Sequence, residues 1–244
     1  MIVVTNLYKS FGAVKAVNGI SFTAQDGEIT GLLGPNGAGK TTTLRMLYSL
    51  LPPDSGQILI DGLDPTRDSL AIKRTLGVVP DGRGLYTRLT ARENIRYYGE
   101  MHGMTKASLA RRIDELIITL DMADFIDRRT EGFSHGQRVK VAIARAVIHE
   151  PKTILLDEPS NGLDVMSTRA LREYILNLKA AGLCIVLSTH IMQEVAALCD
   201  KIVIIAKGRV AADGTAAELL QRSGAETLED AFVQLIGTEE GLLA

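Results

Sequence analysis

The chain has 244 residues, 46% of them hydrophobic and 23% charged, and its net charge is −2. This length is enough for one large domain, or for one domain with an inserted subdomain, around a sizeable core. The near-neutral charge gives no overall attraction to nucleic acid or to an acidic membrane surface, so neither is expected as a partner.

The sequence shows neither the pattern of a membrane-spanning segment nor a cysteine redox motif. No apolar run approaches the roughly 18 residues that a spanning helix needs, and residues 1–10 lack the pattern of a secretory leader. Cys184 and Cys199 lie far from any CxxC spacing and are expected to act as small hydrophobic residues in a reducing compartment. We therefore expect a cytoplasmic chain that reaches a membrane only through a partner.

The first third of the chain is rich in predicted strands. Residues 2–11 and 18–24 alternate apolar and polar side chains, which predicts half-buried antiparallel strands. A strand within 27–33 leads into a glycine-rich loop and a helical pattern, which together cover 34–51. Further short strands are expected within 56–62 and 75–80.

The rest of the chain is helical in the middle and then alternates. The helical pattern runs from about Thr90 to Glu150, and 153–157 and 183–188 are continuous apolar runs typical of parallel strands covered on both faces. A strand pair is expected in 201–214, with a helical tail after it. One face of that tail carries Leu228, Ala231, Phe232 and Leu235. The pattern predicts an α/β protein with a core in 1–85 and 151–210, a helical subdomain in about 86–150 and a helical tail in 211–244.

The strongest chemical signal is GPNGAGKTT, which satisfies G-x-x-x-x-G-K-[ST] between a strand and a helix. Its backbone N–H groups and helix N-terminus suit phosphates. Lys40 is expected to reach the β- and γ-phosphates, and the Thr41 hydroxyl to bind Mg²⁺. The flanking strand and helix argue against an incidental glycine-rich turn. The residues expected to hold a nucleoside triphosphate are Gly34, Pro35, Asn36, Gly37, Ala38, Gly39, Lys40, Thr41 and Thr42.

A second signal is TILLDEPS, an apolar strand that ends in two carboxylates. Ligands of α/β folds bind at the carboxyl ends of parallel strands. Asp157 is expected to hold Mg²⁺ opposite Thr41, and Glu158 to polarise the attacking water. A charged turn after a strand is the alternative, but the P-loop in the same chain argues against it, and the adjacent Asp and Glu favour hydrolysis.

The ordered set GPNGAGKTT, FSHGQ, ILLDEP, NGLD and STH resembles the ATP-binding subunit of an ABC transporter over nearly the whole chain. The resemblance implies a P-loop NTPase head with an antiparallel β subdomain and an inserted helical subdomain. It also implies ATP and Mg²⁺ as cofactors, a head-to-tail homodimer around two ATP molecules, and a separate integral membrane permease as partner.

The resemblance assigns further residues by position. Phe11 matches the aromatic residue that stacks on adenine, although a strand core residue is equally compatible with its place. Residues 161–164 match the D-loop along the dimer seam, and His190 matches the switch histidine on the γ-phosphate, with a catalytic role beside Glu158 and Lys40. The signature motif, which binds the γ-phosphate held by the other subunit, is matched by Ser134, His135, Gly136 and Gln137.

Two positions depart from the family pattern. Asp81 stands where the family usually has a Mg²⁺-binding glutamine; it could bind Mg²⁺ directly or through water, or only cap the turn before Gly82. His135 stands where glycine is common. We hypothesise that protonated His135 strengthens the closed dimer, so that His135→Gly would alter the pH profile of ATPase activity.

Residues 85–104 are similar to the ATP-binding subunits of ABC-2 type exporters, most closely to the sodium-extrusion (Nat) type. That similarity implies Na⁺ export through a NatB-like permease, docked on the helical insertion. The aromatic and methionine side chains in this stretch could form an exposed docking patch or ordinary core, and core is expected for at least half of them. They are Tyr86, Tyr97, Tyr98 and Met101.

Other functions remain as alternatives. A different ABC-2 exporter, for a drug, lipid or polysaccharide, fits the same motifs. An ATPase acting on DNA or ribosomes would need a long coiled coil or a second head, which the sequence lacks. A nucleotide-binding scaffold without turnover is disfavoured because Glu158 and His190 are both present.

Overall fold

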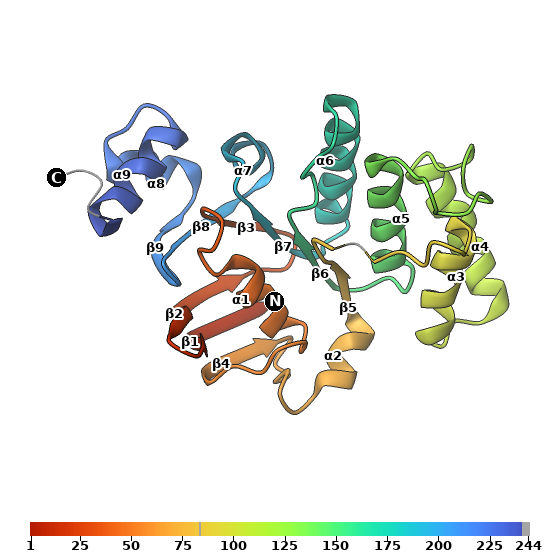
Figure 1. Ribbon diagram of the computed structural model, residues 1–244, viewed down its shortest axis with the longest axis horizontal. Helices are drawn as coiled ribbons and strands as arrows, with labels where there is room; N and C mark the ends of the chain where they lie inside the picture. The colour runs from red at the N-terminus through yellow and green to blue at the C-terminus, as the bar shows by residue number, and fades with distance from the viewer. Residues whose placement is uncertain (83, 241–244) are drawn as a thin grey trace.

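The computed structural model describes residues 1–82 and 84–240, with side chains to residue 237. Two sheets, with helices between and around them, make up most of the molecule (Figure 1). The predicted tail runs to residue 244, and its part in 241–244 lies outside the described residues.

The smaller sheet is antiparallel and has the strand order β2-β1-β4. Its strands are β1 (Ile2–Phe11), β2 (Val14–Ala24) and β4 (Ser55–Ile60). Ile2 lies opposite Ala24 on one side and Ile60 on the other. The predicted half-buried antiparallel strands are confirmed, because the side chains of Ile2 and Val4 are buried while much of the other face is open to solvent. An irregularity in the pairing between Val4 and Leu7 interrupts the alternation, and Leu7 is buried as well.

The larger sheet has the order β5-β6-β7-β3-β8-β9, and all neighbours are parallel except the last pair. Every residue of β3, β6 and β7 is buried, which the continuous apolar runs at 153–157 and 183–188 predicted for β6 and β7. The strands are β3 (Ile29–Leu33), β5 (Leu76–Val79), β6 (Thr153–Asp157), β7 (Cys184–Thr189), β8 (Lys201–Ala206) and β9 (Arg209–Gly214).

Helices cover both faces of the larger sheet. Helix α1 (Lys40–Leu47) lies between the two sheets, and its Leu44 and Leu47 share one core cluster with β1, β6 and β7. Helices α6 (Val165–Ala180) and α7 (Met192–Leu198) lie on the opposite face. The short α2 (Ser69–Thr75) precedes β5. This arrangement is the predicted α/β class with an added antiparallel sheet.

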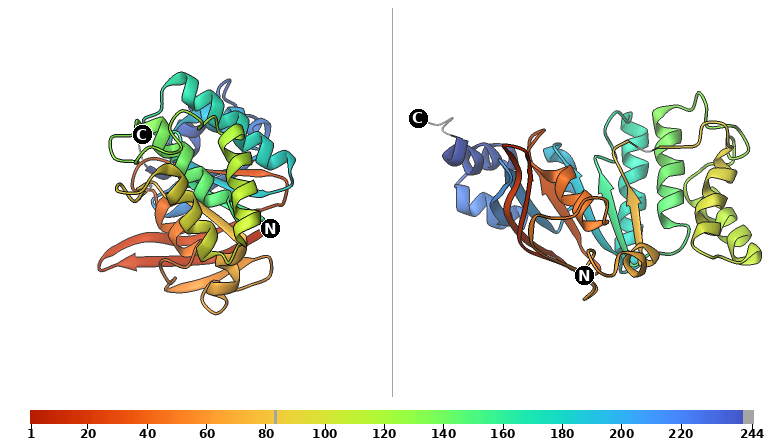
Figure 2. Two further views of the ribbon diagram at one scale, coloured as in Figure 1. Left: turned by 90° about the vertical axis from the view of Figure 1, so that its right-hand side faces the viewer. Right: turned by 60° about the horizontal axis from the view of Figure 1, so that its bottom comes forward.

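The helical middle forms a separate lobe beside the β5 edge, seen at one end of the molecule in Figure 2. It contains α3 (Ala91–Met101), α4 (Lys106–Thr119) and α5 (His135–Val147). One face of α4 is apolar, and its Leu109, Ile113 and Leu116 are buried. Within the described residues, no helix is long and apolar enough to cross a bilayer.

The prediction for the Tyr86–Met101 stretch was wrong. Tyr86, Tyr97 and Met101 are exposed, and only Tyr98 packs against the core. The buried stripe of α3 is made of small or polar as well as apolar residues: Ala91, Asn94, Ile95 and Gly99. Because Tyr97 and Met101 are four residues apart on the other side of the helix, they share the exposed face.

The C-terminal part returns to the body of the molecule. Strands β8 and β9 form the predicted antiparallel pair, followed by α8 (Ala216–Ser223) and α9 (Leu228–Glu240). The predicted face of the tail is confirmed. It packs on β8 and β9 in a cluster that includes Leu228, Ala231, Phe232 and Leu235.

Candidate functional site

The glycine-rich loop between β3 and α1 is shaped by close backbone contacts. A Cβ atom on Gly34 would lie 2.2 Å from the carbonyl oxygen of Ile205, and one on Gly39 would lie 2.4 Å from that of Ala16. Gly39 also has a φ of 109°, which disfavours any side chain. The sequence therefore forces a tight cradle whose N–H groups and helix N-terminus suit an anion.

Lys40 is the first residue of α1, and its ammonium lies inside this loop. Its Nζ donates to the carbonyl oxygens of Gly34 (2.8 Å) and Pro35 (3.2 Å). The same atom lies 3.4 Å from Oε1 of Glu158, and both side chains are almost fully buried. A buried cation thus lies at the neck of the loop, beside a carboxylate.

Oxygen ligands for a hard cation gather at the ends of β6 and β7. The Thr41 hydroxyl donates to Oδ1 of Asp157 at 3.1 Å, and the Ser188 hydroxyl donates to the same atom at 2.5 Å. Adjacent ligands of octahedral Mg²⁺ lie about 2.9 Å apart, so Thr41 and Asp157 fit this ion. In the described part of the chain no three His, Cys, Asp or Glu residues form a metal cluster; Mg²⁺ usually takes only one or two carboxylates beside waters and phosphates.

Glu158 follows directly and is held by several contacts. Its Oε2 lies 2.9 Å from Nδ1 of His190, and its backbone N–H donates to the carbonyl oxygen of Ser188 at 3.0 Å. Its φ is 48°, in the left-handed region that non-glycine residues seldom adopt. Such strain persists only where surrounding contacts enforce it, and it concentrates at functional sites.

These groups line one cleft of about 330 Å³. The structure therefore brings together the predicted loop residues 36–42, Asp81, Glu158 and His190. Of the other predicted residues, Asp157 lies just behind Thr41, whereas Phe11 and the segment 134–137 are not among the described lining residues. The lining is made of Ala16, Asn36, Gly37, Ala38, Gly39, Lys40, Thr41, Thr42, Asp81, Glu158, Asn161 and His190.

Phe11 lies at the end of β1 and is not a core residue. Its side chain is 51% exposed, and the Lys9 ammonium lies 5.8 Å from the ring centroid. The ring therefore offers a free face for stacking.

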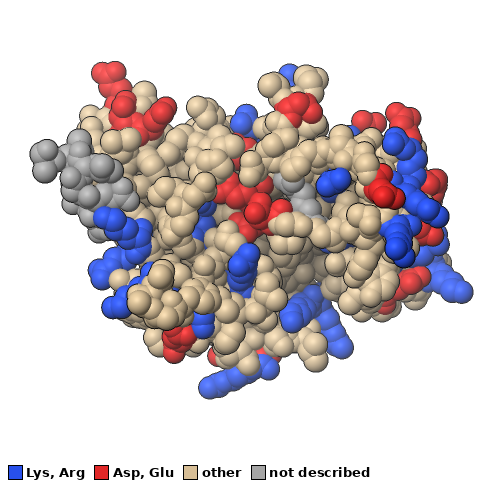
Figure 3. Space-filling view, in the orientation of Figure 1, with Lys and Arg blue, Asp and Glu red and all other residues tan. Residues whose placement is uncertain are grey.

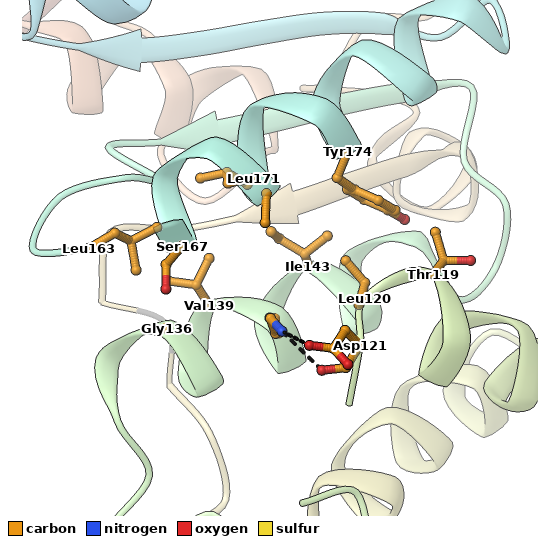
Figure 4. Close-up of a pocket in the computed structure, with 12 residues that line it drawn as sticks. Thr119, Leu120, Asp121, Gly136, Val139, Ile143, Leu163, Ser167, Leu171 and Tyr174 are labelled. Atoms are coloured by element: carbon orange, nitrogen blue, oxygen red, sulfur yellow. Dashed lines mark hydrogen bonds and ion pairs between the residues drawn. The ribbon is translucent and has the colours of Figure 1, made fainter. Parts of the chain in front are cut away.

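The segment 134–137 begins α5 with a reciprocal cap. The Ser134 hydroxyl accepts from the N–H of Gln137, and the Gln137 side chain accepts from the N–H of Ser134. The His135 ring turns toward its own chain, with Nε2 2.5 Å from the carbonyl oxygen of Asn161. Figure 4 shows Gly136 and Ser167 among the residues that line a small pocket between α5 and α6.

Comparison with known proteins places these motifs in a family. Residues 17–161 match the profile of the family described as "ABC transporter". The chain is also 45% identical to the ABC transporter ATP-binding protein NatA of Bacillus subtilis, over 90% of each chain. The chain belongs to the ABC transporter family.

Two solved structures and a further relative agree with this family. A structure titled as the ATP-binding subunit of an ABC transporter matches with a TM-score of 0.89 and 32% identity, covering 97% of this chain and 99% of that one. The dimeric structure of MJ0796, a bacterial ABC transporter cassette, matches with a TM-score of 0.81 and 25% identity over 88% and 98%. The linearmycin resistance ATP-binding protein LnrL of B. subtilis is 36% identical over 93% of this chain and 73% of its own length.

Membership of the family confirms the predicted fold class and the predicted enzyme class: this chain is an ATPase with an ABC-type head. Sequence reasoning missed Ser188, which holds Asp157. The STH stretch that contains Ser188 was recognised only for its histidine. No local pattern pointed to this contact, because it arises from the pairing of β6 with β7, which places Asp157 directly opposite Ser188.

Proposed function

We propose that this ABC ATPase hydrolyses Mg-ATP as a head-to-tail homodimer and powers export through a separate integral membrane permease. The observation that carries the proposal is the Glu158 carboxylate, held at the cleft between Lys40 (3.4 Å) and His190 (2.9 Å). A buried carboxylate in a fixed orientation next to a phosphate cradle suits activation of a water molecule.

Within this proposal each side chain has a separate task. Glu158 accepts the proton of the attacking water, and His190 orients it through the Nδ1–Oε2 hydrogen bond. Lys40 and the loop N–H groups offset the negative charge that builds up on the phosphates. Phe11, with its exposed ring, stacks on adenine.

Thr41 and Asp157 are the residues proposed to hold Mg²⁺, with Asp81 as a further oxygen ligand across the cleft. When bound, Mg²⁺ would supply positive charge that polarises the phosphate oxygens. Ser188 positions Asp157 for this task through its 2.5 Å hydrogen bond.

The proposed dimer assigns the second half of each site to the start of α5. Ser134, His135, Gly136 and Gln137 lie at the N-terminus of a 13-residue helix, where N–H groups favour phosphate. They are not among the described residues that line the cleft of their own chain, and the MJ0796 cassette has a dimeric structure; both observations support a site shared between chains.

Sodium is the proposed export substrate, and the chain would then lie on the cytoplasmic face of the membrane, bound to a NatB-like permease. The support is the similarity of residues 85–104 to the sodium-extrusion (Nat) type and the 45% identity to NatA. Export of another substrate is the second candidate, which the similarity to the linearmycin resistance protein LnrL favours.

Replacing Glu158 tests the catalytic part. Glu158→Gln should lower ATP turnover by about 10²- to 10⁴-fold, the usual effect of losing a general base. It should also leave an ATP-stabilised dimer, measured by light scattering with ATP. Glu229→Gln, an exposed acid on α9, is the matched control and should change neither. Turnover retained in Glu158→Gln would reject Glu158 as the base.

Testing the export substrate requires the partner permease. Affinity purification of this chain from its own membranes should recover one permease, and vesicles containing the pair should move Na⁺ only with ATP. A pair that hydrolyses ATP without moving Na⁺ would reject sodium and leave the ATPase proposal intact.

A further inference from the structure

One side chain joins two segments that the proposed function assigns to different ATP sites. His135, at the start of α5, lies with its Nε2 2.5 Å from the carbonyl oxygen of Asn161. A carbonyl oxygen only accepts, so Nε2 must carry the proton and donate. The signature segment is thereby tied to the loop that follows Glu158 in the same chain.

Close packing holds both segments around the contact between His135 and Asn161. A Cβ on Gly162 would lie 3.3 Å from Nε2 of His135, and a Cβ on Gly136 would lie 2.9 Å from the hydroxyl of Ser167. Ser167 is itself fixed, because its hydroxyl and N–H both bond to the Asp164 carboxylate that caps α6. Glycine at 136 and 162 thus allows the two segments to approach this closely; Gly136 and Ser167 are labelled in Figure 4.

Asn161, which accepts this hydrogen bond, lies in the same turn as Glu158, the proposed catalytic carboxylate. The N–H of Asn161 donates to the carbonyl oxygen of Glu158 at 3.2 Å, and the N–H of Glu158 donates to Ser188. Asn161 also lines the cleft. A displacement of His135 therefore acts on the turn from Glu158 to Asn161, whose first residue holds a strained φ of 48°.

We propose that His135 is a positioning residue. It fastens the start of α5 to the 158–161 turn, so that binding of the signature segment to a partner's nucleotide sets the orientation of Glu158 in its own chain. The effect on Glu158 rests on the proposed function, whereas the hydrogen bond between His135 and Asn161 does not depend on it. The proposal also differs from the hypothesis that protonated His135 strengthens the closed dimer, because here the partner of the ring is a backbone carbonyl of the same chain.

The first test is hydrogen exchange of the nucleotide-free full chain. His135→Leu keeps bulk without a donor, and should raise the exchange rates of the 161–163 amides several-fold. His135→Gln places an N–H donor at similar reach and should leave them near the wild-type rates. Equal rates in all three proteins would overturn the proposal. This result does not depend on catalysis, so it separates failure of the contact from failure of the proposed function.

The second test is steady-state ATP hydrolysis by the same variants. His135→Leu should lower kcat by roughly three- to tenfold, the usual value of one hydrogen bond, with little change in KM. His135→Gln should recover most of kcat. In a Glu158→Gln background, His135→Leu should not weaken the ATP-stabilised dimer. A weaker dimer or a raised KM with kcat unchanged would show that the ring acts on phosphate, and would overturn the proposal.

Discussion

At the scale of single residues, the backbone around the glycine-rich loop determines which side chains fit. Gly34 has no positive φ, so its need for glycine comes only from the Ile205 carbonyl oxygen, 2.2 Å from where a Cβ would lie. Gly34→Ala should therefore force β3 and β8 apart. We expect a loss of about 3 kcal/mol, typical of overpacking against backbone, which lowers Tm by several degrees in a chain of this size.

Gly12→Ala is the matched control for this prediction. Gly12 has a φ of 59° and open space around its Cβ position, so alanine there meets only backbone strain of about 1 kcal/mol. Thermal unfolding of the two variants should give a clearly larger fall in Tm for Gly34→Ala. Similar decreases in Tm for the two variants would mean that the backbone around Gly34 shifts to accommodate a Cβ atom at little cost in free energy.

The residue scale also shows which roles a sequence motif can predict. Lys40 and Glu158 follow from their motifs because each motif is local, and the structure puts both at one cleft. The place of Phe11 was undecided, because strand alternation does not say where a strand leaves the core. The contacts of Ser188 and His135 depend on segments more than 25 residues away, so no local pattern predicted them.

At the scale of helices and strands, α3 and α5 enclose a pair of stacked histidines. The rings of His102 and His149 lie 3.7 Å apart and almost parallel. They line a cleft of about 710 Å³ beside α2, together with Lys73, Arg74 and Arg145. Burial, and next the neighbouring His102, lower the pKa of His149 to about 4; burial also lowers the pKa of His102.

Stability should accordingly fall in mild acid. At pH 7 His149 is neutral in both states. As the pH drops below about 6.5 the unfolded chain takes up a proton first, so stability declines until the folded pKa near 4. Between pH 7 and 5 we expect a loss of roughly 1 kcal/mol from this ring, allowing for solvent screening. In a chain of this length this is about 2–4 °C in Tm.

His149→Phe keeps an aromatic ring on His102 and removes the titration. Its Tm measured from pH 7 to 5 should decline less than that of the wild type, although carboxylate protonation affects both proteins alike. Parallel curves for the two proteins would contradict the assignment of this pH dependence to His149.

Helix and strand positions were largely predictable, and the exceptions have a physical reason. Strands covered on both faces give continuous apolar runs, and the Thr90–Glu93 capping box marks the start of α3. The exposed face of α3 was misjudged because its core stripe contains Asn94, whose amide bonds to backbone groups of Tyr86 and Thr90. Hydrophobicity alone therefore predicted the wrong face of α3 as the buried one.

At the scale of the whole molecule, the chain is elongated, with the helical lobe at one end and the tail at the other (Figure 2). In Figure 3 a cluster of acidic side chains lies near the middle of the visible face, and Lys and Arg side chains are scattered around it. The P-loop cleft lies in the body, and α5 belongs to the lobe. Because both carry parts of the proposed ATP site, two chains in opposite orientation would complete two sites.

Hydrolysis should therefore depend on association. The specific ATPase activity of the purified chain should rise with protein concentration and level off once dimers predominate, because a monomer presents each cleft without a second chain's α5. Activity at several concentrations, with the mass of the species measured by light scattering in ATP, checks this expectation. Constant specific activity in a confirmed monomer would contradict the shared site.

Mixing two inactive variants tests the same arrangement from the other side. Lys40→Ala removes the cation at the cleft, and Ser134→Arg blocks the start of α5. A mixed dimer then contains one intact site, built from the cleft of the Ser134→Arg chain and the α5 of the Lys40→Ala chain. If the two sites turn over independently, an equal mixture should recover about a quarter of wild-type activity, because half of the dimers are mixed and each has one intact site of two. If each site lay within one chain, the mixture would recover no activity, and the wild-type chain would remain active on dilution.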